Sequence, residues 1–369
     1  MMALKCLTLA DIPRLTTRFC VYDNQLAMTL GTKTSTSISA YRWPTPQPKS
    51  LWLARSAVEW RRIYLSHSRD YTPQVTDLMS SLPGFTVAKG FEDRNLTIKL
   101  VFHLLGGLIT DHRLSSQIFA YGSMDKGPNS VREREKELKS AIRNFDEAFR
   151  SDIYGGNIRS FIVSYLTMTL SVSIENIEIL SGRAGFEESQ EMFEVMQDWG
   201  NTAGAREAIW NAGQMLRLIK HLDRLTSFQV VMAYHAGLVL FAYSVLSRAQ
   251  RQLPREHGLP EVVLNGTEDD GVGAFIQHGL ADPTLQGDFR GTERASIPLH
   301  DTDNMIDNVC EIILDRTCTC EHISPQLVNG LVNLLKGKLA SVVLPPESPF
   351  THDIDAAFDF MDQQWIGLV

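Results

Sequence analysis

Apolar residues recur at helical spacing in the stretch that follows position 204. The members of this stripe, separated by four, three, four and three residues, are Ala205, Ile209, Ala212, Leu216 and Ile219. Such spacing is typical of an amphipathic helix with one apolar face, and the charged residues of the stretch fall largely off that face. Gly213 leaves one side of the helix thin, so we expect a neighbouring segment to approach closely there.

A second stretch, 228–247, contains no Asp, Glu, Lys or Arg. A helix that is apolar on nearly every side lies either in a large protein core or in lipid. Gln229, His235, Gly237 and Ser244 interrupt the apolar run and make lipid the poorer environment. The pattern therefore predicts a central buried helix, and no membrane partner is expected.

The rest of the chain alternates helical patterns with polar connections. Further helices are expected at 15–30, 51–65, 96–119, 131–149, 158–180, 189–199, 271–278, 303–314 and 326–339. Residues 31–50 and 248–299 are expected to be loop-rich, because Pro, Gly and acidic residues gather there. Sustained period-two alternation is missing. We predict one all-α domain over 1–369, an irregular array of packed helix pairs around buried apolar helices.

Composition narrows the functional class. The chain has 369 residues, of which 44% are hydrophobic and 21% charged, values typical of a globular protein. The net charge of −8 is unfavourable for a large phosphate-binding surface. Five scattered cysteines favour reduced thiols in a nuclear or cytoplasmic setting. The first apolar run is too short for a signal peptide. Common catalytic and nucleotide-binding motifs, such as G-x-S-x-G, the P-loop and H-E-x-x-H, are missing from the sequence.

The two helical stretches carry a family resemblance. The first reads A-R-E-A-I-W-N-A-G-Q-M-L-R-L-I-K from position 205, and the second reads F-Q-V-V-M-A-Y-H-A-G-L-V-L-F-A-Y from position 228. Together they resemble the helical heart of the fungal-specific transcription factor domain, the regulatory region that follows the zinc finger in fungal regulators. Weaker similarities, R-F-C-V-Y-D at 18–23, L-W-L-A-R-S-A-V-E-W-R-R-I-Y at 51–64 and the segment 262–280, extend the resemblance over 14–340.

The resemblance implies a regulator of transcription, with secondary metabolism as an expected setting, that senses a small-molecule effector or other transcription proteins and forms a homodimer. Its DNA-binding module is expected to be missing. A two-zinc cluster needs six closely spaced thiolates, and only Cys6 and Cys20 lie near the start. The segment R-F-C-V-Y-D lies well inside the domain in typical relatives, so the resemblance implies that the chain begins inside the family's domain. We therefore expect neither a zinc finger nor direct DNA binding. No cofactor or metal is expected.

A ligand pocket between the two helices is one interpretation of their polar and aromatic residues. Its candidate lining residues are Arg206, Trp210, Gln214, Arg217, Tyr234, His235 and Tyr243. The alternative is plain packing, because aromatic residues at helical spacing mostly belong to a core.

A repurposed protein is the rival functional hypothesis. A large apolar interior could bind a hydrophobic metabolite and act on it as an isomerase or cyclase, with His235 and either Tyr234 or Tyr243 as its catalytic groups. The simpler interpretation of His235 is a hydrogen-bonded core histidine. A gene remnant without an independent role is the third alternative.

Other chemical groupings have simple structural interpretations. Cys310, Cys318, Cys320, Glu321 and His322 form the nearest approach to a metal pattern, but no second ligand knuckle accompanies them. A cluster of His103, Asp111 and His112 lacks the i,i+4 spacing that metal ligands on one helix prefer. The acidic residues 268–270 are expected to stabilise a helix N-terminus. Four arginines, at 55, 61, 62 and 69, are expected to lie on a solvated face.

Overall fold

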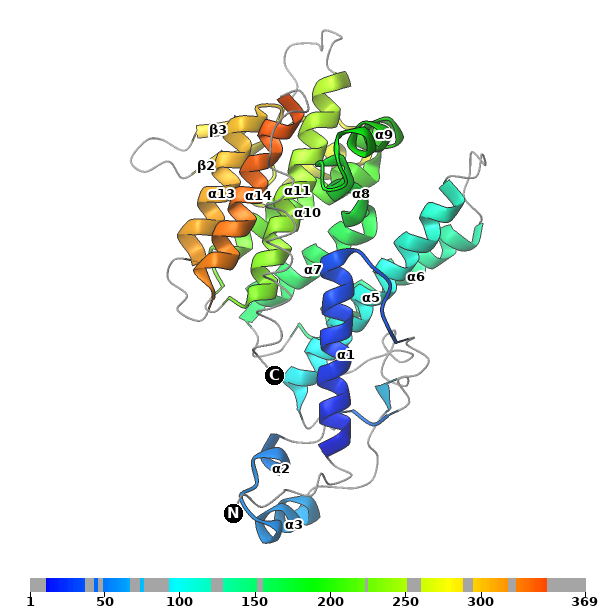
Figure 1. The fold of residues 1–369 in the computed structure, drawn as a ribbon, viewed down its shortest axis with the longest axis vertical. Coiled ribbons are helices and arrows are strands. Elements are labelled where there is room, and N and C mark those ends of the chain that lie inside the picture. Colours follow the sequence, from blue (N-terminus) through cyan, green and yellow to red (C-terminus); the bar gives the residue numbers. More distant parts are fainter. Residues whose placement is uncertain are drawn as a thin grey trace. The chain divides into compact units, whose positions relative to one another are not determined.

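The computed structural model describes residues 11–36, 43–45, 49–66, 74–75, 93–120, 129–150, 155–222, 225–250, 260–287, 295–317 and 323–343. Helices account for most of this part of the chain (Figure 1), and its strands form one small three-stranded sheet. The all-α class predicted from the hydrophobic pattern is confirmed. The chain divides into two compact units, Met1–Ile153 and Tyr154–Val369, which are taken one at a time below.

The first unit is built on two long helices. Helix α1 (Asp11–Leu30) packs along α5 (Arg94–Ala120). A Cβ atom added at Gly106 or Gly107 of α5 would overlap the Met28 or Asn24 side chain of α1. The two glycines let α1 approach closely, and α5 continues through them unbroken.

Three further helices belong to the first unit. Helix α6 (Asn129–Ala148) packs on α5, whereas α2 (Lys49–Leu53) and α3 (Ala57–Ser66) replace the single helix expected over 51–65. The break occurs because Ser56 starts a new helix. Its hydroxyl accepts a hydrogen bond from the Glu59 backbone N–H at 3.1 Å, and the Glu59 carboxylate accepts one from the Arg55 N–H at 2.8 Å.

Helix α10 (Ala203–Ile219) is the central element of the second unit. It packs against α7 (Gly155–Ser171) on one side and against α11 (Ser227–Gln250) on another. All five residues of its predicted apolar stripe are fully buried. The amphipathic helix expected from the spacing is therefore confirmed, and its apolar face forms the middle of the core.

The apolar segment 158–180 forms two helices, α7 and α8. Helix α8 (Ile174–Leu180) is separate from α7 because Ser173 is extended, with φ −83° and ψ 118°, and its hydroxyl accepts a hydrogen bond from the Asn176 N–H. Helix α9 (Phe186–Met196) packs on α8, and a 3-10 turn, η3 (Trp199–Asn201), leads into α10.

Helix α11 is the uncharged helix predicted at 228–247. It is the one helix of the described residues that is long and apolar enough to cross a membrane, but 94% of the relevant window is buried inside the protein. Helices α13 (Thr302–Thr317) and α14 (Pro325–Val343) pack against each other and against α11, where Gly237 meets Val309 and Leu335. Burial among helices supports the interpretation of α11 as a core element.

A small sheet lies within the segment expected to be loop-rich at 248–299. Strand β1 (Glu261–Val263) pairs in parallel with β2 (Asp282–Gly287), and β2 pairs antiparallel with β3 (Ala295–Pro298). Helix α12 (Asp270–His278) connects β1 to β2, as a parallel pair requires. The helix was expected, whereas β2 and β3 were not.

Candidate functional site

A pocket of about 530 Å³ opens where the last turn of α10 meets the segment from β1 to α12. Arg217, Lys220 and His221 line it from α10 and the residues just after it. These positions are three and four residues apart, so they share one side of the helix end. The volume lies in the range of small-molecule sites, roughly 300–1,000 Å³.

The rest of the lining is mixed in character. Two carboxylates, Glu261 and Asp269, bring negative charge, and Thr267 and Gln286 bring neutral hydrogen-bonding groups. Apolar contact comes from two valines, at 263 and 272. The lining is therefore more polar than that of a typical cavity for a hydrophobic metabolite.

The turn that follows β1 is held firmly on α10. A Cβ atom at Gly213 would lie 2.5 Å from both the carbonyl oxygen and the Cβ of Leu264, so only glycine allows this approach. The Gln214 side-chain amide donates hydrogen bonds to the carbonyl oxygens of Leu264 at 2.8 Å and Gly266 at 3.0 Å. The close approach expected at Gly213 is confirmed, and Gln214 anchors a pocket wall from outside it.

The same wall is tied to the sheet. Asn265 donates from Nδ2 to the carbonyl oxygen of Gln286 and accepts from the Gln286 N–H at Oδ1, both at 2.8 Å. This reciprocal pair continues the β1–β2 ladder beyond the last strand residue. One side of the pocket is thus built from backbone held in place by two side-chain amides.

The two carboxylates of the pocket have hydrogen-bond partners, whereas the Nε of Arg217 has none among the described residues. Asp269 caps α12, since its Oδ1 accepts from the N–H groups of Gly271 at 2.9 Å and Val272 at 3.2 Å, and Glu261 accepts from the Ser296 hydroxyl at 3.0 Å. The Nε of Arg217 is out of contact with solvent and has no hydrogen-bond partner among the described residues. The carboxylates have donors of their own, whereas the guanidinium has an unmet need for an acceptor.

Arg206, the first of the expected pocket residues, joins three elements. Its guanidinium donates to the carbonyl oxygens of Ile276 at 2.9 Å, Gln277 at 3.1 Å and Asn201 at 2.7 Å. The first two carbonyls belong to the last turn of α12, where helices leave acceptors unpaired. Arg206 therefore holds α12 and the 3-10 turn on α10 and does not line the pocket described above.

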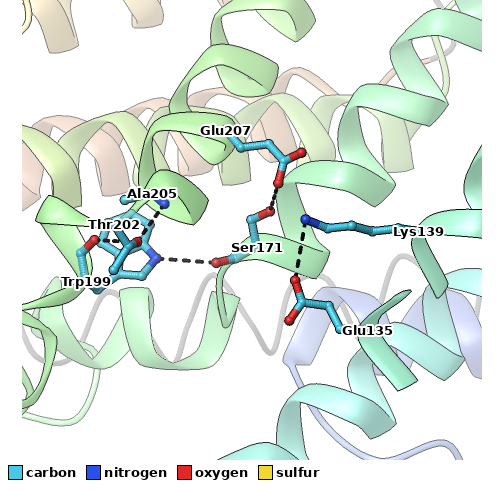
Figure 2. A network of polar contacts seen from close by, with 7 residues as sticks. All are labelled: Glu135, Lys139, Ser171, Trp199, Thr202, Ala205 and Glu207. Atoms are coloured by element: carbon cyan, nitrogen blue, oxygen red, sulfur yellow. Dashed lines mark hydrogen bonds and ion pairs between the residues drawn. The ribbon is translucent and has the colours of Figure 1, made fainter. Parts of the chain in front are cut away.

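A polar network surrounds the start of α10 (Figure 2). The Thr202 hydroxyl accepts from the Ala205 N–H at 3.0 Å and donates to the Trp199 carbonyl at 2.8 Å. The Trp199 indole donates to the Ser171 carbonyl at 3.3 Å, and the Ser171 hydroxyl donates to Glu207 at 3.0 Å. These contacts cap α10 and fix it to the end of α7, so they position the helix that carries the pocket.

The three expected catalytic residues lie in the packed core. His235 is 1% exposed, and its Nδ1 lies 3.0 Å from the hydroxyl of Tyr165 on α7. Burial lowers the pKa of His235 to about 3 and raises the pKa of Tyr234 and Tyr165 well above the usual value. Tyr234 and Tyr243 are also buried, and Tyr243 lies eight residues beyond His235, about 12 Å along the helix axis. None of the three lines the pocket at the end of α10.

The polar residues of α5 belong to the first unit and do not line the pocket. The Nδ1 of His103 lies 2.7 Å from the Lys99 carbonyl of its own helix, and burial lowers the pKa of His103 to about 4. Burial raises the pKa of Asp111 and lowers that of His112. Among the described residues, no group of three His, Cys, Asp or Glu side chains is arranged to hold a metal.

The remaining candidate groups are placed only in part. Cys310 is buried, its thiol points to the Val332 carbonyl at 3.9 Å, and burial raises its pKa to about 11. The other members of that pattern, 318 and 320–322, lie outside the described residues, as does position 69 of the basic group. Arg55, Arg61 and Arg62 are exposed around a stacked Trp60–Tyr64 pair.

The pocket at the end of α10 shares one residue with the lining suggested by the sequence. Of the seven expected lining residues, Arg217 lines the pocket, and Trp210 is buried in α10. Lys220 and His221 continue the basic end of the same helix, and this charge pattern was the available signal. The helix at 271–278 and the acidic residues before it were recognised, but the place of β1 and β2 at the pocket depends on strand pairing over about twenty positions.

Thr267 is the one residue with a hydroxyl group among those that line the pocket, and it forms no hydrogen bond with a base among the described residues. Comparison with protein-family models, with curated proteins and with solved structures finds no match for this chain.

Proposed function

We propose that this chain is the regulatory, effector-binding region of a fungal transcription factor and does not make DNA contacts of its own. The observation that carries the proposal is the open pocket at the end of α10. The same helix bears the sequence that resembles the family and packs against α7 and α11 in the middle of the core. An occupant of the pocket therefore touches the element to which much of the second unit is attached.

Transmission of a signal follows from the rigid attachment of the pocket wall. Gln214 and Gly213 fasten the turn after β1 to α10, and Arg206 fastens the other end of α12. A ligand that bridges Arg217 and the β1–α12 segment stabilises the arrangement in which both are docked. Its effect is a shift between packing states, limited by its difference in affinity for them.

The catalytic alternative is less well supported. It requires His235 and a tyrosine at the wall of an apolar cavity, but His235 is buried against Tyr165. Its burial and its contact with Tyr165 favour the simpler interpretation of a hydrogen-bonded core histidine. Partners of the proposed regulator are the effector, other transcription proteins and a second copy of the chain, in the nucleus or the cytoplasm. The net charge of −8 supports the absence of direct DNA binding.

A reporter experiment tests the proposal. The chain is fused to an unrelated DNA-binding domain in yeast, and reporter expression is measured during growth on different carbon, nitrogen and phosphate sources. We expect a severalfold change relative to the DNA-binding domain alone, dependent on the nutrient. An unchanged reporter, with folded fusion protein present in the nucleus, would contradict the regulatory role.

A second measurement addresses DNA contact. The purified chain is titrated with mixed-sequence and promoter DNA at physiological salt, since electrostatic binding falls steeply with salt. We expect no specific retention. Sequence-specific binding that survives physiological salt would overturn this part of the proposal.

A further inference from the structure

We infer that the pocket at the end of α10 binds a small carboxylic acid that also carries amino or hydroxyl donors, such as an amino acid or a hydroxy acid. The inference deepens the proposed function by naming the chemistry of the effector. It rests on that proposal for its biological meaning, whereas the binding itself follows from the pocket.

One side chain of the pocket, that of Arg217, lacks an acceptor for a donor atom. Arg217 Nε is shielded from solvent without an acceptor, and its side chain forms no hydrogen bond or ion pair with the described residues. Arg217 as a whole is half-buried. A donor atom such as its Nε is destabilising when it loses water and gains no partner. A carboxylate matches the planar, two-pronged geometry of a guanidinium and supplies the missing acceptor.

The neighbouring charges narrow the class of anion. Lys220 adds a second cation, whereas Glu261 and Asp269 set two carboxylates in the same pocket. Their negative charge disfavours a polyphosphate or a nucleic acid backbone, which would place several charges near them. A single carboxylate satisfies the basic end and leaves the acidic residues for hydrogen-bond donors.

The acidic residues have acceptor capacity left for those donors. Asp269 uses Oδ1 to cap α12, and Glu261 uses Oε2 for the Ser296 hydroxyl. Each carboxylate has a second oxygen, and an ionised carboxylate has about four acceptor sites. An amino or hydroxyl group of the ligand fits this capacity, and Thr267 and Gln286 provide neutral partners.

The experiment uses the purified full-length chain and defined probes. Single L-amino acids, lactate and malate are each tested at millimolar concentration by thermal shift and then by titration calorimetry. Inorganic phosphate and putrescine are the comparison anion and cation. We expect at least one amino or hydroxy acid to bind more tightly than either comparison compound. No binding by any acid, or tighter binding of phosphate, would overturn the inference.

Variants locate the site. Arg217→Gln removes the guanidinium, and we expect affinity for the bound acid to fall about tenfold or more, the usual effect of losing a charge-assisted hydrogen bond. Arg217→Lys keeps the charge without the fork and is expected to lose less. Arg316→Gln is the matched control, because Arg316 also has a buried Nε in the same unit but lies outside the pocket. Equal affinity of Arg217→Gln and wild type would place the acid elsewhere and end the proposal.

A folding failure does not block the test. If Arg217→Gln unfolds, Lys220→Gln and Thr267→Ala change the same pocket from solvent-accessible positions, and both are expected to weaken binding. The two proposals also fail differently. If the reporter responds to nutrients but no acid binds, the regulatory function stands and this inference is contradicted. If an acid binds but the reporter does not respond, this inference stands and the regulatory function is contradicted.

Discussion

His235 shows what burial does to a single ionisable side chain. Its ring stacks near Tyr165, shares a hydrogen bond with that hydroxyl and lies where burial lowers its pKa to about 3. The folded protein therefore keeps this imidazole neutral at pH values where the unfolded chain is protonated. Protonation of the unfolded state, below its usual pKa of about 6.5, favours unfolding.

The histidine predicts a pH dependence with a defined sign. The contribution of the neutral His235 to the free energy of unfolding is fully present above about pH 6.5 and is lost as the pH falls toward 3. About 2 kcal/mol of it is lost by pH 5. We expect the difference in free energy of unfolding between wild type and His235→Gln to shrink by that amount between pH 7 and pH 5. Urea unfolding followed by circular dichroism measures the gap.

An exposed histidine provides the control for that prediction. His278→Gln, at a solvent-facing position of α12, makes the same substitution without removing a buried imidazole. A gap between His235→Gln and wild type that stays constant with pH would show that the buried imidazole is not the titrating group.

Two glycines predict opposite results for the same substitution. Gly213→Ala places a methyl group 2.5 Å from the Leu264 carbonyl oxygen, and we expect a loss of about 1–3 kcal/mol in the free energy of unfolding through overpacking. Gly273→Ala meets nothing within 4 Å on α12 and is expected to stabilise the helix by up to about 1 kcal/mol. Chemical denaturation of both variants gives the comparison, and equal effects would contradict the close approach at Gly213.

At the scale of elements, α12 depends on contacts at both of its ends. Asp269 caps its first turn, and Arg206 donates hydrogen bonds to two carbonyl oxygens of its last turn. Gly279 then ends the helix with a left-handed φ of 70°. The helix has nine residues, too few for independent stability in water. Its place beside the pocket therefore rests on these terminal contacts and on the two apolar residues that it buries, Val272 and Phe275.

Removal of Arg206 should loosen this element without unfolding the unit. In Arg206→Gln, we expect amide hydrogen exchange within 260–287 to accelerate at least about tenfold, as local opening costs less free energy. Exchange in α11 should change little. Arg183→Gln, which removes a guanidinium paired with Glu178 away from this segment, is the comparison. Uniform acceleration in all helices would mean that Arg206 supports the whole core.

The hydrophobic pattern predicted elements where the information is local. The stripe at 205–219 and the uncharged run at 228–247 each identify a helix because their own residues set the periodicity. The breaks at Ser56 and Ser173 were missed because a serine cap competes with continuous apolar periodicity around it. Strand β2 was missed because it is short, contains Pro283 and ends in glycine, and its pairing partners lie elsewhere in the chain. The pocket was hard to predict for the same reason, since Glu261, Val263 and Gln286 of that sheet line it.

At the scale of the molecule, each of the two compact units has buried residues of its own. In the second unit, α7, α10, α11, α13 and α14 bury an extensive apolar core. We expect residues 154–369, produced alone, to be helical by circular dichroism and to unfold cooperatively. Non-cooperative unfolding of this fragment, with cooperative unfolding of the full chain, would favour the single domain expected from the sequence.

Helix α11 also matters before the protein is complete. Its uncharged surface is covered in the folded state by α13 and α14, and residues 251 to 343 must still be synthesised when α11 has just been made. At a translation rate of roughly 5–20 residues per second, this interval lasts roughly 5–20 s. During that time the nascent chain presents a segment as apolar as a membrane anchor to the cell, so its synthesis calls for a chaperone that shields α11 on the ribosome.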